Sequence, residues 1–229
     1  MAQTATASEV ADNLRRIRSD IDQAAEAAGR DARSVTLVAV SKVQPVERVR
    51  ASLVAGHRIF GENRVQEAKA KWPALKADFP GVELHLIGPL QTNKVKEAVA
   101  LFDVIQTIDR MKLARMVADE MHRSGRRIPC YLQVNTGEEP QKAGVSPRDV
   151  DAFLAACKAE CDLTLVGLMC IPPADQDPAP HFAMLADLAR QNRVPILSMG
   201  MSDDYPTAVR LGATHVRVGS ALFGDRKPG

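Results

Sequence analysis

Runs of apolar, often β-branched residues alternate along the chain with segments whose apolar residues recur at helical spacing. The apolar runs are typical of strands buried on both faces in a parallel sheet. They span residues 35–42, 58–63, 83–89, 103–109, 128–136, 163–171, 195–202 and 215–223. Helical patterns separate them at residues 46–55, 65–79, 94–101, 110–124, 147–159, 181–191 and 204–211. The pattern therefore predicts strands that alternate with helices.

This alternation favours an α/β fold with a parallel sheet, closed as a single (β/α)8 barrel of the TIM type. The 229 residues are close to the roughly 250 residues typical of that fold. An open doubly wound sheet is the alternative, but it calls for a glycine-rich turn after the first strand, where this chain has Val43-Gln44-Pro45.

A further helical pattern precedes the first strand, at residues 8–29, with Ser8 suited as its N-cap and Gly29 as its C-cap. We expect this leading segment, residues 1–30, to pack on the barrel. No stretch is typical of an interdomain linker, so residues 1–229 are expected to form one domain. The Pro- and Asp-rich residues 172–180 are interpreted as a loop between the sixth strand and its helix.

Composition narrows the function classes. A formal charge of +2 and an aromatic content of 4% give no reason to expect nucleic-acid binding. No apolar run approaches membrane-spanning length, and the N-terminal segment lacks a signal-peptide pattern, so a cytoplasmic protein without membrane contact is expected. The four cysteines lack the spacing and the histidines of a metal site, so we interpret them as reduced thiols and predict no metal.

The first strand is the clearest functional signal, because this apolar run ends on Lys42. The carboxyl ends of buried parallel strands are where α/β folds place their chemistry. A desolvated lysine amine there is a nucleophile that can form a Schiff base. The plainer alternative is a lysine that reaches solvent from a strand end.

The loops after the seventh and eighth strands carry small and hydroxyl residues, namely Gly200, Ser202, Gly219 and Ser220. Such residues let backbone N–H groups approach an anion closely, and these two loops are the usual phosphate site of a barrel. Tight turns capped by serine would give the same pattern. Both loops together with Lys42 favour a phosphorylated aldehyde held by a Schiff base and a phosphate-binding cup.

Other polar residues have plainer interpretations. Arg217 lies between valines in a central strand, where it must meet a ligand or a carboxylate. His85 lies in an alternating strand and is interpreted as a barrel-interior residue rather than a base. The cluster Lys69, Lys71, Lys94 and Lys96 is interpreted as a solvated helix face, with an entry patch for anions formed by some of these lysines as the alternative.

Ser41-Lys42 and residues 60–63, 85–94, 198–204 and 217–224 closely resemble segments of the pyridoxal phosphate homeostasis protein family, which is similar to the barrel domain of alanine racemase. The resemblance implies that pyridoxal 5′-phosphate (PLP) is bound to Lys42 as a Schiff base. It also implies that Arg217 faces the pyridine nitrogen and that Asn63 lies near the ring. Ser202, Gly219 and Ser220 would hold the phosphate, with Met199 and Gly200 in the same site.

Members of that family are known as PLP carriers or regulators of vitamin B6 and amino-acid pools, without established catalysis. The resemblance therefore implies a protein that carries or buffers PLP and is not an enzyme. Its expected partners are PLP and PLP-dependent apo-enzymes that receive the cofactor, and we expect a monomer.

A PLP-dependent enzyme is the alternative, namely an amino-acid racemase or a decarboxylase of the same barrel type. Racemases of this type resemble two-domain dimers in which a tyrosine of the partner chain is the second base. Here Gly229 follows Phe223 by six positions, which is too short for a second domain, and the chain has only Tyr131 and Tyr205. An aldolase- or isomerase-type barrel that uses Lys42 without a cofactor is a further alternative, which a yellow chromophore would exclude.

Overall fold

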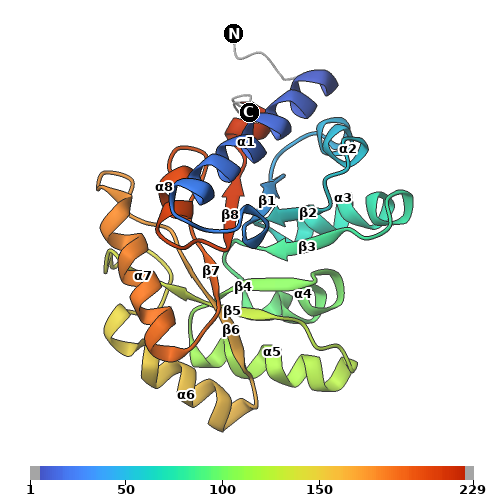
Figure 1. Cartoon of the computed structure of the whole chain (residues 1–229). Helices are drawn as coiled ribbons and strands as arrows, with labels where there is room; N and C mark the ends of the chain where they lie inside the picture. Colours follow the sequence, from blue (N-terminus) through green and yellow to red (C-terminus); the bar gives the residue numbers. More distant parts are fainter. Residues whose placement is uncertain (1–5, 225–229) are drawn as a thin grey trace.

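Eight parallel strands close into a barrel in the computed structural model, which describes residues 6–224. Each strand pairs with the next along the chain, and the last pairs with the first (Figure 1). The strands are β1 (Thr36–Val40), β2 (Ile59–Glu62), β3 (Glu83–Leu86), β4 (Val104–Ile108), β5 (Cys130–Val134), β6 (Leu165–Cys170), β7 (Ile196–Ser198) and β8 (His215–Val218). The predicted (β/α)8 barrel is confirmed.

Helices surround the barrel and cover its outer face (Figure 1). They are α1 (Ala7–Ala27), α2 (Val46–Val54), α3 (Val65–Asp78), α4 (Val95–Leu101), α5 (Met111–Ser124), α6 (Val150–Cys161), α7 (Pro178–Asn192), α8 (Tyr205–Arg210) and α9 (Ser220–Phe223). Short 3₁₀ turns lie at Ala32–Ser34, Thr92–Lys94 and Pro147–Asp149. None of the helices in residues 6–224 is long and apolar enough to cross a bilayer.

The leading helix α1 packs against α2, α8 and α9. Its N-cap is Thr6 rather than the predicted Ser8, because Thr6 and Glu9 form a reciprocal capping box. The helix ends at Ala27, and Gly29 follows with a φ of +66°, the left-handed conformation that glycine adopts without strain.

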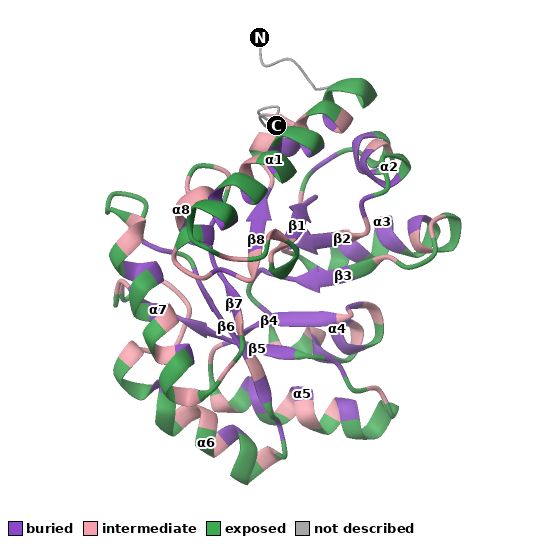
Figure 2. Ribbon diagram, in the orientation of Figure 1, coloured by how far each residue is buried: buried purple, intermediate pink, exposed green. Residues whose placement is uncertain are grey.

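The strands are buried, whereas the helices expose one face to solvent (Figure 2). Side chains that point outward from the strands pack with the inner helix faces in one continuous apolar core, which includes Phe60, Trp72, Phe102 and Phe182. Buried side chains outside this core, such as Val38, Ile87 and Met169, belong to the barrel interior, as expected from the alternation of side chains along each strand.

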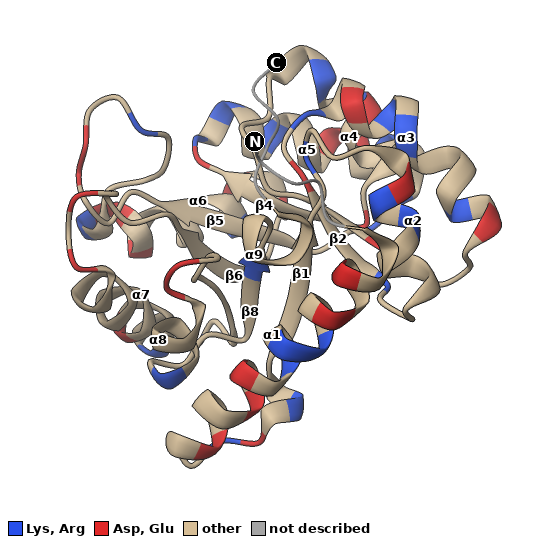
Figure 3. Ribbon diagram, turned by 90° about the horizontal axis from the view of Figure 1, so that it is seen from above, with Lys and Arg blue, Asp and Glu red and all other residues tan. Residues whose placement is uncertain are grey.

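Charged residues lie mainly on the helices and loops. Basic and acidic segments are interspersed over α1, α2 and α3 (Figure 3). This distribution agrees with the near-neutral formal charge of +2.

Strand β1 ends two residues before Lys42. Its ladder with β2 runs to the pair Val40 and Gly61, and the Ser41 amide then donates to the Gly61 carbonyl at 3.0 Å. Lys42 and Val43 form the turn that follows, and Val43 has a φ of +54°. Lys42 therefore lies beyond the carboxyl edge of the sheet, the end of the barrel that we call the mouth.

Candidate functional site

Most of the predicted site residues converge on the mouth. Lys42 follows β1, Asn63 follows β2, and the two small-residue loops follow β7 and β8. Met199 is different, because its side chain is fully buried in the apolar core outside the barrel wall. Met199 can therefore reach a ligand at the mouth only through its backbone.

The turn that carries Lys42 is fastened on both sides by α3 and β2. The Lys71 ammonium donates to the Ser41 carbonyl at 2.8 Å, and the Ser41 hydroxyl donates to Glu62 Oε1 at 2.7 Å. On the other side of Lys42, the Val43 amide donates to Glu67 Oε1 at 2.5 Å. Lys42 itself is half-buried.

A buried ion cluster makes these contacts. The Glu62 side chain is fully buried and the Lys71 side chain is 7% exposed, and Lys71 Nζ lies 3.0 Å from both Glu62 and Glu67. Trp72 Nε1 also donates to Glu62 Oε1 at 3.0 Å. Buried charges are retained when they are paired and hydrogen-bonded, as here.

The interpretation of Lys71 as part of a solvated face is therefore wrong. Lys69 and Lys96 are exposed, and Lys69 pairs with Glu97 at 2.5 Å, whereas Lys71 faces the barrel wall. The missed signal is Glu62, because a carboxylate at the end of an apolar strand needs a buried cation nearby.

The loops after β7 and β8 meet at Ser202. The Ser202 hydroxyl oxygen accepts hydrogen bonds from the backbone amides of Gly219 at 3.2 Å and Ala221 at 3.3 Å. Two backbone N–H groups at the start of α9 thus converge on one oxygen, an arrangement that also suits an oxygen of an anion. Ser220, between them, is exposed.

Different structural features explain why glycine stands at two positions in these loops. At Gly219 an added Cβ would lie 3.3 Å from Val40 Cβ, so the loop runs close to the end of β1. Gly200 has a φ of +92°, and an added Cβ would lie 2.5 Å from Ala208 Cβ. Glycine at position 200 is therefore required by its backbone conformation and by packing on α8.

Arg217 is a buried cation at the mouth, 4% exposed. It donates to the Ser198 hydroxyl and to the Cys170 carbonyl, each at 2.8 Å. Within residues 6–224 no carboxylate forms an ion pair with it. Burial lowers the pKa of Arg217, and Cys170 and the charge of Asp204 partly offset this effect. The sequence predicts that Arg217 meets either a ligand or a carboxylate. Among the described residues, no carboxylate is bonded directly to it.

Asn63 presents an unused acceptor at the mouth. Its Oδ1 atom is buried and has no hydrogen-bond partner within the described residues. Gly88 packs closely against the backbone of Asn63, because an added Cβ at Gly88 would lie 2.3 Å from the Asn63 carbonyl oxygen. An unsatisfied buried acceptor costs free energy, so the site suits a ligand that donates to it.

Both tyrosines are held elsewhere. Tyr205 donates to Asp20 on α1 at 2.6 Å, and burial raises the pKa of its hydroxyl. The Tyr131 ring lies inside the barrel, 5.9 Å from the ring of His215 at the first position of β8. Neither tyrosine hydroxyl is therefore placed beside Lys42.

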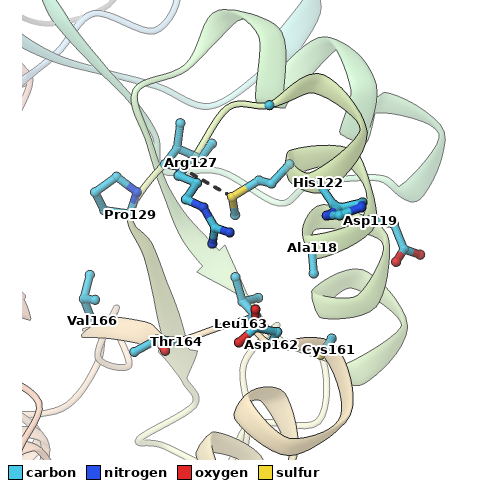
Figure 4. A pocket seen from close by; sticks show the side chains of 13 residues that line it. Ala118, Asp119, His122, Arg127, Pro129, Cys161, Asp162, Leu163, Thr164 and Val166 are labelled. Carbon is cyan, nitrogen blue, oxygen red and sulfur yellow. Dashed lines mark hydrogen bonds between the residues drawn. The ribbon is translucent and has the colours of Figure 1, made fainter.

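A hollow of about 610 Å³ lies away from the mouth, at the amino ends of β5 and β6. Its lining includes Asp119, Arg127 and Asp162, and the Ile128 amide donates to Met121 Sδ at 3.5 Å at its edge (Figure 4). It shares no residue with the mouth, so it is separate from the site around Lys42.

Comparison with known proteins places this geometry in a family. The alanine racemase N-terminal domain model matches residues 13–227. The chain is 41% identical to the pyridoxal phosphate homeostasis protein of Pseudomonas aeruginosa, over 97% of this chain and 98% of the relative. It is 35% identical to the protein of the same name from Escherichia coli, over 95% and 97% of the two chains.

Solved structures agree with these sequence comparisons. PipY of Synechococcus elongatus, in a structure with PLP bound, is 39% identical and superposes with a TM-score of 0.81, covering 94% of this chain and 100% of PipY. A D-threonine aldolase from Filomicrobium marinum, at 17% identity and a TM-score of 0.70, shares the fold; 94% of this chain covers 60% of that enzyme. The chain therefore belongs to the alanine racemase N-terminal domain family, among the pyridoxal phosphate homeostasis proteins.

Proposed function

We propose that this protein binds PLP at the barrel mouth and carries or buffers the cofactor within vitamin B6 and amino-acid homeostasis, without catalytic turnover. One observation carries the proposal: a lysine, a buried arginine that no acid within residues 6–224 pairs with, and two converging backbone N–H groups lie at the same end of the barrel. An amine-reactive, anionic ligand with a hydrogen-bond acceptor for the arginine matches these three features together.

The residues present fit this cofactor. Lys42 would hold the aldehyde as a Schiff base, and the amides of Gly219 and Ala221, with the Ser202 and Ser220 hydroxyls, would hold the phosphate. Arg217 would face the ring nitrogen. The unpartnered Asn63 Oδ1 would accept a hydrogen bond from the ligand or from bound water near the ring.

PLP supplies an aldehyde that reacts reversibly with primary amines and a ring that withdraws electrons. The residues of this chain orient those groups. A positively charged arginine that donates to the ring nitrogen keeps this nitrogen unprotonated, which weakens the ring as an electron sink. This favours storage of the cofactor over carbanion-forming chemistry.

The positions of the tyrosines support the absence of racemase activity. Racemisation needs a base on each face of the substrate carbon. Lys42 can serve one face, whereas Tyr205 is bonded to Asp20 and Tyr131 lies in the barrel interior. Transfer of the cofactor to PLP-dependent apo-enzymes, a monomeric state and a cytoplasmic location remain parts of the proposal.

The visible absorption spectrum of the purified protein tests PLP binding. Addition of PLP should give a visible band that borohydride reduction removes, because reduction converts a Schiff base into a stable amine. A protein whose spectrum is the sum of free PLP and polypeptide would contradict the proposal.

A further inference from the structure

A chain of hydrogen bonds crosses the barrel interior from Arg217 to the opposite end. Arg217 Nη1 and Ser198 Oγ are 2.8 Å apart, and Ser198 Oγ and Gln106 Oε1 are 2.6 Å apart. Gln106 Nε2 lies 2.7 Å from His85 Nδ1, and His85 Nε2 lies 2.6 Å from Glu83 Oε1. Four successive hydrogen bonds thus connect five residues from four strands, β3, β4, β7 and β8.

The chain begins in the buried interior and ends in partial contact with solvent. Ser198, Gln106 and His85 are fully buried, and Arg217 is 4% exposed. Glu83 is the first residue of β3, at the amino ends of the strands, and its side chain is 47% exposed. The hydrogen bond from His85 is the main reason that the pKa of Glu83 is below its usual value.

The two charged ends, Glu83 and Arg217, set the direction of the bonds in this chain. A carboxylate can only accept, so His85 donates to Glu83 from Nε2, and in this tautomer its Nδ1 accepts from the Gln106 amide NH₂. The Gln106 carbonyl oxygen then faces Ser198 and accepts the serine proton. The Ser198 oxygen in turn accepts from Arg217, because a guanidinium can only donate.

This order keeps an acid away from Arg217 while fixing its orientation. Its two bonds, to Ser198 and to the Cys170 carbonyl, go to neutral acceptors on different strands and so define the plane of the guanidinium. Glu83, the acid at the far end of this hydrogen-bond chain, is separated from Arg217 by three intervening side chains. The guanidinium of Arg217 is thus held in one orientation. No carboxylate of residues 6–224 is bonded to it and neutralises its charge.

We propose that Ser198, Gln106 and His85 are positioning residues that hold the Arg217 guanidinium in the orientation in which it meets the ring of the ligand at the mouth. This inference rests on the proposed function for the identity of the ligand. None of the three residues needs to touch the ligand, since each acts through the next residue in the chain.

The test compares Gln106→Leu with Gln133→Leu. Gln133 is also a buried glutamine, on the neighbouring strand β5, but its amide donates to the Ala143 carbonyl and takes no part in the chain. Each variant is titrated with PLP and, separately, with inorganic phosphate. In Gln106→Leu the PLP affinity should be about tenfold weaker, because the charged Arg217 no longer holds a well-oriented hydrogen bond to the ligand. The phosphate affinity of this variant should be unchanged. The PLP affinity of the Gln133→Leu control should also be unchanged.

Nitrogen NMR of the imidazoles gives a second, ligand-free readout. In the wild type, His85 should carry a proton on Nε2, with Nδ1 acting as acceptor. Gln106→Glu keeps the side-chain shape but has no N–H to donate to Nδ1, so the signal of Nδ1 should shift. This variant tests the chain even if Gln106→Leu does not fold.

Two results would overturn the inference: a proton on Nδ1 alone in the wild type, or a folded Gln106→Leu variant that binds PLP as tightly as the wild type. Failure of the wild type to bind PLP would instead contradict the proposed function and remove the ring-positioning role with it. The His85 tautomer would then still decide whether the chain runs in the derived direction.

Discussion

The Lys71 ammonium lies 2.8 Å from the carbonyl oxygen of Ser41, the residue immediately before Lys42. The same ammonium pairs with Glu62 and Glu67, and Glu67 in turn accepts from the Val43 amide. A second, buried lysine therefore anchors the peptide on either side of the lysine that we propose as the reactive one.

Replacement of Lys71 should destabilise the fold strongly. Lys71→Met leaves Glu62 buried without its cation, and removal of one partner of a buried pair costs about 3–5 kcal/mol. Lys69→Met, on the same helix, removes an exposed pair with Glu97 and should cost less than about 1 kcal/mol. Urea unfolding followed by circular dichroism measures both, and equal effects would show that Lys71 does not act as a buried partner.

Val43 should be under backbone strain. It is a β-branched residue with a φ of +54°, and the residue is 64% exposed, so packing gives it little compensation. Val43→Gly should raise the free energy of unfolding by about 1 kcal/mol, since relief of the strain exceeds the entropy cost of glycine.

The control for Val43 is Val54→Gly. Val54 is 73% exposed at the end of α2 and is not among the residues with positive φ. Glycine there should lower stability by up to about 1 kcal/mol. A Val43→Gly variant that is destabilised like Val54→Gly would rule out strain at the Lys42 turn.

Ser202 should contribute directly to phosphate binding. Ser202→Ala removes the oxygen on which the Gly219 and Ala221 amides converge, together with a donor to the phosphate. Loss of one hydrogen bond to a charged group corresponds to a PLP affinity roughly ten- to a hundredfold weaker. Gly219→Val should be worse, because the loop already lies close to Val40. Wild-type affinity in Gly219→Val, measured by absorbance titration, would place the anion elsewhere.

The alternation of apolar runs and helical patterns was sufficient to predict the barrel, because each strand is buried on both faces and each connection is a helix. The position of Lys42 followed from the same pattern, apart from the strand end. The strand ends at Val40, where the bond from the Ser41 amide to the Gly61 carbonyl completes the last pair of the ladder and Lys42 enters a turn. Strand-end residues such as Ser202 and Gly219 could be predicted to lie close together, because the carboxyl ends of parallel strands share one edge.

Contacts between residues distant in the sequence could not be predicted in this way. Gln106 and Ser198 are 92 positions apart, and only closure of the barrel makes them neighbours. Lys71 resembles its exposed neighbour Lys69 in sequence, and its burial depends on the side of α3 that faces β2. Met199 was assigned to the site by its place in a motif, but alternation along the strand directs its side chain into the outer core.

The protein should not racemise alanine. Tyr205 is bonded to Asp20 and Tyr131 lies in the interior, so no tyrosine supplies the second base. Incorporation of solvent deuterium at Cα of D- and L-alanine, followed by NMR, should show no interconversion of the enantiomers. Turnover on the order of 1 s⁻¹ or faster, within the usual range for enzymes, would place the protein among the racemases. Exchange of one enantiomer alone, dependent on Lys42, would reveal one competent base.

Peptide mass mapping after borohydride reduction of the PLP-loaded protein tests the central claim most directly. The account predicts a pyridoxyl group on Lys42, loss of the visible band in Lys42→Ala, and an unchanged label in Lys69→Ala, whose lysine is exposed on α3. A label found mainly on another lysine, or a Lys42→Ala variant with the wild-type spectrum, would contradict it.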